Sequence, residues 1–246
     1  MASMGSRDDD AVDPYWEAAG GAGYHSLFPN ERVAAHVLGR RWYHALEVAR
    51  QIGIGDDSAV LELGCGDGEF AIEVLGRRFR RVDALDGSRA AIARATARSN
   101  PGHVHFHVSD LRTHDYTEGA RWDGAFLLGL LHHVKPSAAA IVTRLSSVAP
   151  RVVVIEPNGD NVMRRLIERL PSCRRAGEAS FRLRELVSLF QRAGYELRTH
   201  RSMNLFLART PAPLLPVMAG LERWVEAHPS LRVLCGTRAL GFTRSS

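Results

Sequence analysis

Between residues 59 and 155 the chain repeats one pattern, a short apolar run followed by a longer stretch with helical spacing. The apolar runs lie at 59–63, 81–86, 103–108, 123–128 and 151–155. The stretches with helical spacing lie between them, at 69–77, 88–99 and 137–148. Strands that alternate with helices are joined by right-handed crossovers, so the pattern predicts a parallel sheet with helices on both faces.

The flanking segments extend this α/β pattern. Helical spacing begins at Pro29 and stops at Gly53. Further helical segments are expected at 160–170, 182–194 and 214–225, and further strands at 195–207 and 233–243. Because no repeat, linker or charge boundary is visible, we expect one domain over residues 14–246, behind a disordered tail or tag remnant at 1–13. Within it we expect an N-terminal cap (14–54), a ligand-binding core (55–160) and a lid insertion (205–232).

One apolar stripe near the C-terminus allows several interpretations. Its members share one face of a predicted helix and are Leu214, Val217, Met218, Leu221 and Val225. We favour burial of this face in the core. A dimer face and loose contact with a lipid-like substrate are the alternatives, so we expect either a monomer or a homodimer.

Composition argues against several classes of protein. No apolar run approaches the ~20 residues that a membrane span requires, and the acidic N-terminus lacks the apolar segment of a secretory signal. The three cysteines form no C-x-x-C pair, which predicts free thiols in a reducing, cytoplasmic compartment and no metal site. The net charge is +5, but 27 acids are interspersed among 32 Lys and Arg residues, so we expect no nucleic-acid-binding stripe.

The most specific stretch is VLELGCGDGEF at 60–70, where a buried strand meets a helix through three glycines. Gly64, Gly66 and Gly68 leave the turn without side chains, so that a ligand can approach the backbone closely. The following helix offers its free N–H groups at the same place. Cys65, inside the turn, is better explained as a small residue in a tight bend than as a nucleophile.

Two details indicate a nucleoside ligand without phosphates. Asp86 ends the second apolar run, where a carboxylate is suited to accept hydrogen bonds from two ribose hydroxyls. An Asp-Gly turn in which Ser88 caps the next helix is the plainer alternative, and both roles are compatible. The glycines also depart from the G-x-G-x-x-G spacing of dinucleotide-binding proteins. Glu69 stands in place of the third glycine, and its carboxylate would repel a pyrophosphate.

Five stretches in order resemble the motifs of the class I S-adenosylmethionine-dependent methyltransferases. They cover about residues 55–160 and are ELGCGDG from Glu62, LDGS from Leu85, VSDL from Val108, the segment from Trp122 to Val134, and VVVIEPN from Val152. The resemblance implies a Rossmann-like, seven-stranded, mostly parallel sheet with helices on both faces and an antiparallel last strand. It also implies an N-terminal helical cap and a helical insertion near the C-terminus.

The same resemblance implies that S-adenosylmethionine binds at the glycine turn and leaves as S-adenosylhomocysteine. In that arrangement Glu62 orients the turn and offsets the positive groups of the cofactor. Asp86 holds the ribose. Asp110 meets the adenine, with an ordinary turn residue as the alternative. Leu128 and Gly129, at the end of the fourth strand, supply backbone contacts near the ammonium. The implied cofactor residues are Glu62, Gly64, Cys65, Gly66, Gly68, Asp86, Gly87, Ser88, Asp110, Leu111, Leu128 and Gly129.

The candidate catalytic residues are histidines and one tyrosine. Because sulfonium chemistry is carried by the cofactor, a general base matters only where the acceptor must lose a proton. The resemblance places His132 and His133 beside the methyl group, and packing is the alternative for both. Tyr24 and His25 in the aromatic N-terminal segment are further candidates, again with packing as the alternative.

The acceptor is expected to be a small organic molecule, such as a specialised metabolite, methylated at O, N or C by in-line displacement. Glu156 and Asn158 are expected to line the mouth of the site and bind this substrate. The D/N-P-P-Y/F motif of adenine-N6 enzymes and the Pro-Cys of cytosine-C5 enzymes are both missing from the sequence. An RNA methyltransferase and a protein that binds the cofactor or its product without turnover are the alternatives.

Overall fold

The computed structural model describes residues 14–22, 28, 30–98, 102–113, 121–171, 173, 179–205 and 210–245. Its helices are α1 (Pro14–Ala22), α2 (Glu31–Gln51), α3 (Arg89–Ala97), α4 (Ala138–Val148), α5 (Val162–Ile167), α7 (Leu183–Arg192) and α8 (Leu215–Ala227). Short turns of helix are η2 (Ala71–Leu75), η3 (Lys135–Ser137), η4 (Ala212–Leu214) and η5 (Pro229–Leu234). The strands are β1 (Ala59–Leu63), β2 (Arg81–Asp86), β3 (Val104–Val108), β4 (Gly124–Leu128), β5 (Arg151–Pro157), β6 (Tyr195–Met203) and β7 (Thr237–Arg244).

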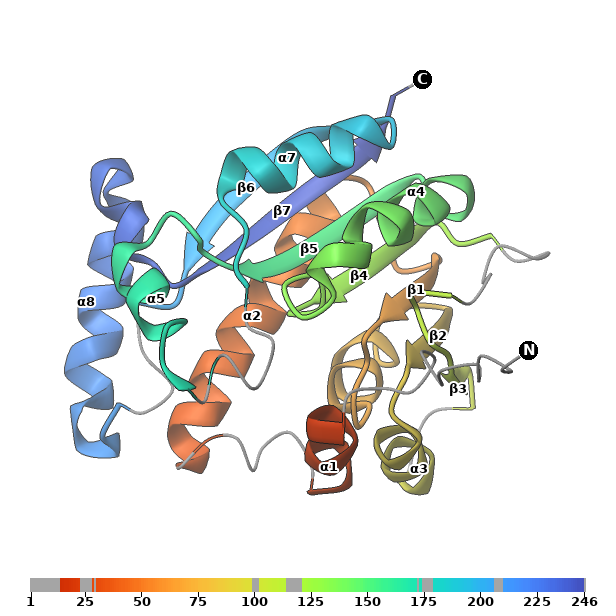
Figure 1. Cartoon of the computed structure of the whole chain (residues 1–246), viewed down its shortest axis with the longest axis horizontal. Helices are drawn as coiled ribbons and strands as arrows, with labels where there is room; N and C mark the ends of the chain where they lie inside the picture. Colours follow the sequence, from red (N-terminus) through yellow and green to blue (C-terminus); the bar gives the residue numbers. More distant parts are fainter. Residues whose placement is uncertain are drawn as a thin grey trace, which may run out of the picture.

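The seven strands form one sheet in the order β3-β2-β1-β4-β5-β7-β6 (Figure 1). The first five strands pair in parallel, and β7 runs antiparallel to both of its neighbours. The predicted Rossmann-like sheet with a reversed last strand is therefore confirmed. The strand order changes direction between β1 and β4. In open sheets of this kind a ligand binds at the carboxyl ends of the strands at that point.

Two apolar cores lie on opposite faces of the sheet, because successive side chains of a strand point to opposite sides. On one face Leu61 and Leu63 of β1 belong to a cluster with Ile141 of α4 and Phe190 of α7. On the other face Val60 belongs to a second cluster, to which α2 and the segment after the glycine turn contribute Val48, Ile52, Phe70 and Leu75. The central strands are buried on both sides, which explains why they read as continuous apolar runs.

The long helix α2 begins and ends close to the predicted residues. Asn30 caps its first turn, because its Oδ1 accepts hydrogen bonds from the backbone N–H groups of Arg32 at 2.9 Å and Val33 at 3.3 Å. Gly53 follows the helix with φ of 81°, a conformation that favours glycine.

The helix predicted at 69–77 differs from the expected form, because its middle part, η2, is π-helical. The N–H of Gly76 donates to the carbonyl of Ala71 at 2.7 Å, five residues earlier. The wider turn keeps Phe70, Ala71, Ile72 and Leu75 buried together against the sheet. The segment after the glycine turn is thus anchored by packing.

The predicted burial of the apolar stripe on α8 is wrong. Of its five members Val225 is buried, whereas Val217 is 73% exposed, and Leu214 and Leu221 are also exposed. The helix turns the flank that carries Val225 and two acids inward, and these acids meet partners on α2. Glu222 is only 1% exposed and hydrogen-bonds to His36 Nε2 at 2.8 Å, and Glu226 forms an ion pair with Arg40.

Across the part of the chain that the structure describes, every helix is too short or too polar to cross a bilayer.

The glycine turn gives a test of backbone strain. Gly68→Ala should destabilise the protein by about 2 kcal/mol, since a side chain is strained at its φ of 77° and the new Cβ would lie 2.7 Å from the Phe106 ring. Gly39→Ala within α2 is the matched control. Nothing lies within 4 Å of its Cβ position, so this change should stabilise by up to about 1 kcal/mol. Denaturant unfolding measures both, and equal stability of the two variants would contradict the assigned strain.

Candidate active site

The loop after β1 is held to the end of β2 by its own backbone. Gly64, Gly66 and Gly68 have φ values of 76°, 55° and 77°, the left-handed conformation in which glycine is favoured. The N–H groups of Gly64 and Cys65 both donate to the carbonyl of Leu85, at 2.7 and 3.1 Å. The loop therefore lies at the carboxyl edge of the sheet where the strand order reverses.

The structure gives a second reason why two of these positions are occupied by glycine. A Cβ on Gly64 would lie 2.9 Å from Leu130 Cδ1, and a Cβ on Gly68 would lie 2.8 Å from Ala95 Cβ. At these two positions the side chain is excluded by the protein's own packing and by φ, whether or not a ligand is bound. Close approach of a ligand was the only reason that the sequence offered.

Asp86 connects the loop to the next helix. Its Oδ2 accepts from the N–H of Gly66 and its Oδ1 from the N–H of Ser88, both at 2.8 Å. Burial raises the pKa of this carboxyl group, and the two backbone hydrogen bonds partly oppose the rise. Each carboxylate oxygen has further acceptor capacity, and the side chain is partly exposed, so two ribose hydroxyls can still bind there.

Ser88 and Gly87 complete this turn. The hydroxyl of Ser88 accepts from the N–H of Ala91 at 3.0 Å and caps α3. Ser88 is fully buried, so its side chain serves the helix. The capping role predicted for it is confirmed, and only the partly exposed Gly87 and Asp86 present atoms toward a ligand from this turn.

Glu62 is a buried carboxyl group whose surroundings suit a positively charged ligand group. It is 2% exposed, and among the described residues its Oε2 has no hydrogen-bond partner. Burial, followed by the nearby carboxylates of Asp86 and Asp67, raises its pKa to about 8. A buried carboxyl group in this position accommodates a positively charged ligand group, which would satisfy the oxygen and favour its ionised form.

Cys65 does not have the surroundings of a nucleophile. Burial raises the pKa of its thiol well above the usual value, and the carboxylates of Glu62 and Asp86 add to the rise. A protonated thiol that is 7% exposed is a packing residue, as the sequence indicated.

The predicted adenine site follows β3. Asp110 forms a two-pronged ion pair with Arg112, with Nε–Oδ1 at 2.9 Å and Nη2–Oδ2 at 2.7 Å. Partial burial opposes ionisation of Asp110, but the hydrogen bonds and charge of Arg112 outweigh it and lower the pKa. Leu111 is buried beside it. Arg112 therefore fixes the carboxylate that the resemblance assigns to adenine, and this partner was not foreseen.

The loop after β4 brings the candidate bases to the same edge. Gly129 has φ of 70° and donates its N–H to the carbonyl of Ile155 at 2.7 Å, while the preceding Leu128 stays partly exposed. A Cβ on Gly129 would lie 3.8 Å from His132 Cε1, an ordinary contact. His132 thus stands next to the strand end that is expected to contact the cofactor.

Glu156 positions His132. Its carboxylate, 1% exposed, accepts from the N–H of Leu131 at 2.8 Å, from the N–H of His132 at 3.3 Å and from His132 Nδ1 at 2.7 Å. These bonds assign the Nδ1 proton to the side facing Glu156 and leave Nε2 as the basic nitrogen of the neutral ring. Glu156 is therefore a positioning residue for His132, in place of the substrate contact that was expected.

Asn158 also differs from expectation. It is fully buried, and its Nδ2 donates to the carbonyls of Cys235 at 2.8 Å and Val233 at 3.3 Å. Its Oδ1 accepts from the N–H of Asp160 at 3.0 Å. Because both ends of the amide bind backbone groups, Asn158 holds the C-terminal segment against β5 and presents no surface to a substrate.

The N-terminal helix α1 covers the site from one side, beside α3 (Figure 1). The ring of Trp16 lies 4.2 Å from the ring of His133, which in turn lies 3.8 Å from His132. Glu17 Oε1 accepts from the N–H of Ala90 at 3.0 Å, at the start of α3. Trp16 and Glu17 were missed as site residues, although they belong to the N-terminal cap predicted at residues 14–54.

Tyr24 and His25, the other two candidate bases, lie outside the described residues.

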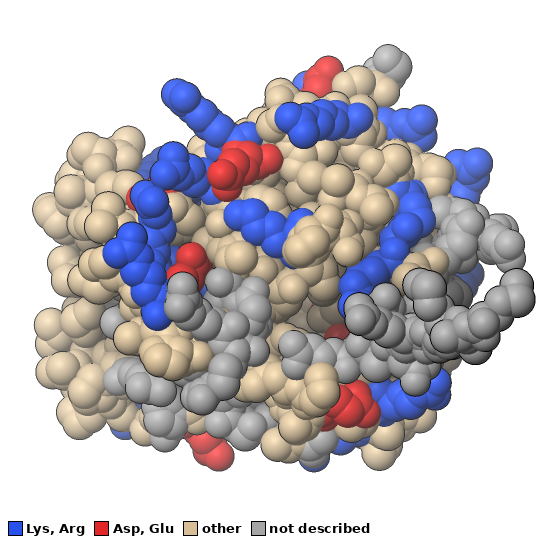
Figure 2. Space-filling view, in the orientation of Figure 1, with Lys and Arg blue, Asp and Glu red and all other residues tan. Residues whose placement is uncertain are grey.

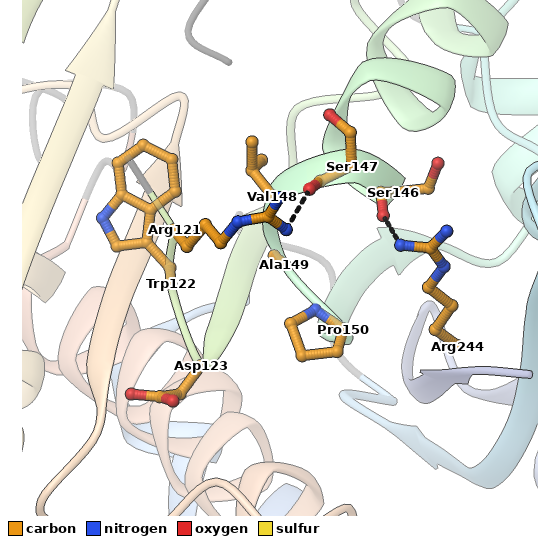
Figure 3. Close-up of a pocket in the computed structure, with 9 residues that line it drawn as sticks. All are labelled: Arg121, Trp122, Asp123, Ser146, Ser147, Val148, Ala149, Pro150 and Arg244. Carbon is orange, nitrogen blue, oxygen red and sulfur yellow. Dashed lines mark hydrogen bonds between the residues drawn. The ribbon is translucent and has the colours of Figure 1, made fainter. Parts of the chain in front are cut away.

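A pocket of about 280 Å³ lies at the opposite, amino edge of the sheet, between Trp122 and Arg244 (Figure 3). Figure 3 shows Arg121 and Arg244 pointing at the last turn of α4, where they donate to the carbonyls of Ser147 at 3.2 Å and Ser146 at 2.9 Å. Arginines that bind the carbonyl end of a helix explain this pocket without a ligand.

The chain matches a family model described as a methyltransferase domain over residues 34–200. It therefore belongs to the methyltransferase domain family, and the class that the five motifs predicted is confirmed. No curated protein is detectably similar to it.

Solved structures share the fold. Magnesium protoporphyrin IX methyltransferase from Synechocystis PCC 6803, solved with bound SAM, is 16% identical with a TM-score of 0.61, over 99% of this chain and 100% of that one. A chain from the complex between the Haloferax volcanii Trm112 methyltransferase activator and a putative methyltransferase is 16% identical with a TM-score of 0.66, over 98% and 100%. DhpI, solved with SAH, is 22% identical with a TM-score of 0.59, over 94% of each chain.

Glu62 predicts proton release on cofactor binding. With a pKa of about 8 it is mostly protonated at pH 7, and a bound cation favours the carboxylate, so binding of S-adenosylmethionine should release close to one proton. Calorimetry in buffers of different ionisation enthalpy measures this number. Glu62→Gln keeps the shape but cannot ionise, and it should abolish the release. An unchanged proton count in the variant would show that Glu62 is not the titrating group.

Asp86 is predicted to dominate ribose binding. Asp86→Ala should weaken S-adenosylmethionine affinity by about 1–3 kcal/mol, because it removes acceptors from the ribose and from the N–H of Gly66. Asp57→Ala, at an exposed position in the turn before β1, is the matched control and should leave affinity unchanged. Titration calorimetry compares the two, and equal affinity in both variants would remove Asp86 from the site.

Proposed function

We propose that this protein transfers a methyl group from S-adenosylmethionine to a small organic acceptor whose nucleophilic atom must lose a proton. The observation that carries the proposal is the buried Glu156, which binds Nδ1 of His132 at 2.7 Å at the carboxyl end of β5. A carboxylate that orients a histidine in this way is a common arrangement for a general base.

The residues present fit the cofactor. When bound, S-adenosylmethionine supplies a methyl group activated by a sulfonium, and the protein's task is to hold it and align the acceptor. The unpartnered Oε2 of Glu62 suits the positive groups of the methionine part. Asp86 suits the ribose, Asp110 with Leu111 suits the adenine, and the backbone at Leu128 and Gly129 suits the ammonium. The cofactor-bound neighbours of the same fold support this assignment.

Glu156 and His132 supply the proton chemistry. The Nε2 of His132 receives the proton of the acceptor, and the resulting imidazolium is stabilised by the carboxylate on its other side. Because Glu156 is 1% exposed, its interaction with the imidazolium is little screened by water. Such a base favours an acceptor that is a poor nucleophile when neutral, a hydroxyl or a carbon acid, over an amine that is already a free base.

The surroundings of the site support a small acceptor. Trp16 of α1 packs on the ring of His133, so an aromatic wall stands beside the candidate base. The face seen in Figure 2 carries Lys and Arg side chains in separate groups with acids among them, and no continuous basic band crosses it. An RNA substrate is bound through such bands, so the RNA alternative has less support.

The proposal predicts a division between binding and turnover. His132→Asn should lower kcat about 10²–10⁴-fold, and Glu156→Gln should lower it by less, since the amide keeps an acceptor oxygen but loses the charge. Neither change should alter S-adenosylmethionine affinity by more than about twofold, because neither residue is placed on the cofactor. His107→Gln, on the exposed side of β3, is the control.

The assay uses methyl-labelled S-adenosylmethionine with panels of phenols, carbon acids, amines and RNA, followed by pH profiles with the best acceptor. The wild-type protein should methylate the best acceptor, and His132→Asn should lower the rate at every pH measured. Full turnover by that variant would remove the base from the mechanism. Labelling of RNA alone would refute the small acceptor, and tight cofactor binding without any labelled product would favour a binding protein.

A further inference from the structure

Large apolar side chains gather on one exposed surface built by the segments after β5 and around α8. Their exposed fractions range from 42% at Leu221 to 73% at Val217. We call this the α5–α8 surface, and its members are Val162, Met163, Leu166, Leu170, Leu214, Val217, Leu221, Trp224, Val233 and Leu234. Among the described residues only Tyr15, Tyr43 and Val108 are comparable and lie elsewhere. Monomeric proteins seldom concentrate exposed apolar residues in this way without an interaction to serve.

The segments α5, η5 and α8 are joined in turn by a hydrogen bond and by packing, so their exposed residues lie on one part of the molecule. Asn161, which caps α5, donates from Nδ2 to the carbonyl of Leu234 in η5 at 2.8 Å. The turn η5 follows α8 directly and packs against it. Figure 1 shows α8 at one end of the molecule with α5 next to it in the view, and Figure 2 shows largely uncharged surface over α8.

The charges on these segments are one-sided. Each acid that the structure describes on α5, α8 and the residue after α5 is paired within the protein: Glu168 with Arg164 at 3.0 Å, Glu222 with His36, and Glu226 with Arg40. The remaining charged side chains are arginines that face solvent, namely Arg165, Arg169, Arg223 and Arg232. Among the described residues, the exposed charges that border the apolar surface are thus positive, which is complementary to an anionic partner.

This charge pattern argues against a second copy of the chain. A two-fold contact places the same patch of both subunits face to face. The four arginines of one copy would meet the four of the other, and the acids described on these segments are already paired, so like charges would face each other across the interface, which is unfavourable.

We propose that the α5–α8 surface binds a membrane that contains anionic lipids. Apolar side chains with a tryptophan on one side and arginines at the border are the features of segments that lie in the headgroup layer. The arginines would bind lipid phosphates while Val217, Leu221 and Trp224 enter the boundary of the acyl chains. Such binding is peripheral and needs no spanning helix, in agreement with the helices described.

Vesicle co-sedimentation of the full chain tests the proposal. Vesicles of phosphatidylcholine alone are compared with vesicles that contain about 30% phosphatidylglycerol, at low and high salt. We expect at least tenfold stronger binding to the anionic vesicles and loss of most of this gain at high salt. The fluorescence of Trp224 should shift to the blue on binding, and Trp224→Phe should remove the shift.

Matched variants separate the apolar and the charged contributions. Val217→Ser with Leu221→Ser should lower binding at least tenfold, whereas Tyr43→Ser, an equally exposed apolar residue on α2, should change it less than twofold. Arg165→Gln with Arg223→Gln should likewise lower binding to anionic vesicles at least tenfold. The control pair, Arg77→Gln with Arg192→Gln, removes the same charge from other exposed positions and should have little effect. All changes are at exposed side chains, so thermal unfolding should confirm intact folding.

Three results would overturn the proposal. The first is the absence of binding to either vesicle, and the second is binding that the apolar variants and their control retain equally. The third is a dimer in sedimentation equilibrium that Val217→Ser with Leu221→Ser dissociates, since the surface would then be a contact between copies. None of these results bears on methyl transfer, which is measured separately with the labelled cofactor.

Discussion

Three carboxyl groups meet where β1 and β2 end, and the rest of the site is arranged around them. Glu62, Asp67 and Asp86 are close enough that the last two raise the pKa of the first, in addition to the larger effect of burial. Buried like charges are costly for a folded protein and persist where they serve a ligand. A cation without phosphate would relieve this repulsion, whereas a nucleotide phosphate would add to it, so the cluster fits the sulfonium nucleoside of the proposed function better than a dinucleotide.

A second buried carboxylate organises the other half of the site. Glu156 binds two backbone N–H groups of the loop after β4 and the ring of His132 at once. Because β4 and β5 are parallel neighbours, the end of β5 lies beside the loop that it holds. In the proposed function the two carboxylates have different tasks: Glu62 would respond to the charge of the cofactor, and Glu156 would orient the proposed base, His132.

The sequence predicted those features that depend on a local pattern of residues. It did not predict which side chains are buried by partners far away in the chain. Strand and helix positions, the stop at Gly53 and the cap at Ser88 follow from neighbouring residues and were foreseen. The inward turn of α8 was not, because Glu222 and Glu226 pair with His36 and Arg40, which lie 186 residues earlier in the chain. Glu156 was expected to face substrate because the strand pattern of β5 shows its position only. Its three hydrogen bonds go to residues distant in the sequence and could not be foreseen. The pattern of glycines at 64–68 was read correctly as a turn, although packing against Leu130 and Ala95 could not be inferred from spacing.

The end of β5 joins the site to the α5–α8 surface. Glu156 holds His132, and two residues further on Asn158 binds the carbonyls of Val233 and Cys235, while Asn161 binds that of Leu234. These bonds connect the start of α5 to η5, and the apolar side chains of Val162, Met163, Val233 and Leu234 beside them are exposed. A surface attached through backbone carbonyls can remain exposed without loosening the strand beneath it. The fold thereby places the buried Glu156 at the end of β5 and the exposed α5–α8 surface just beyond it.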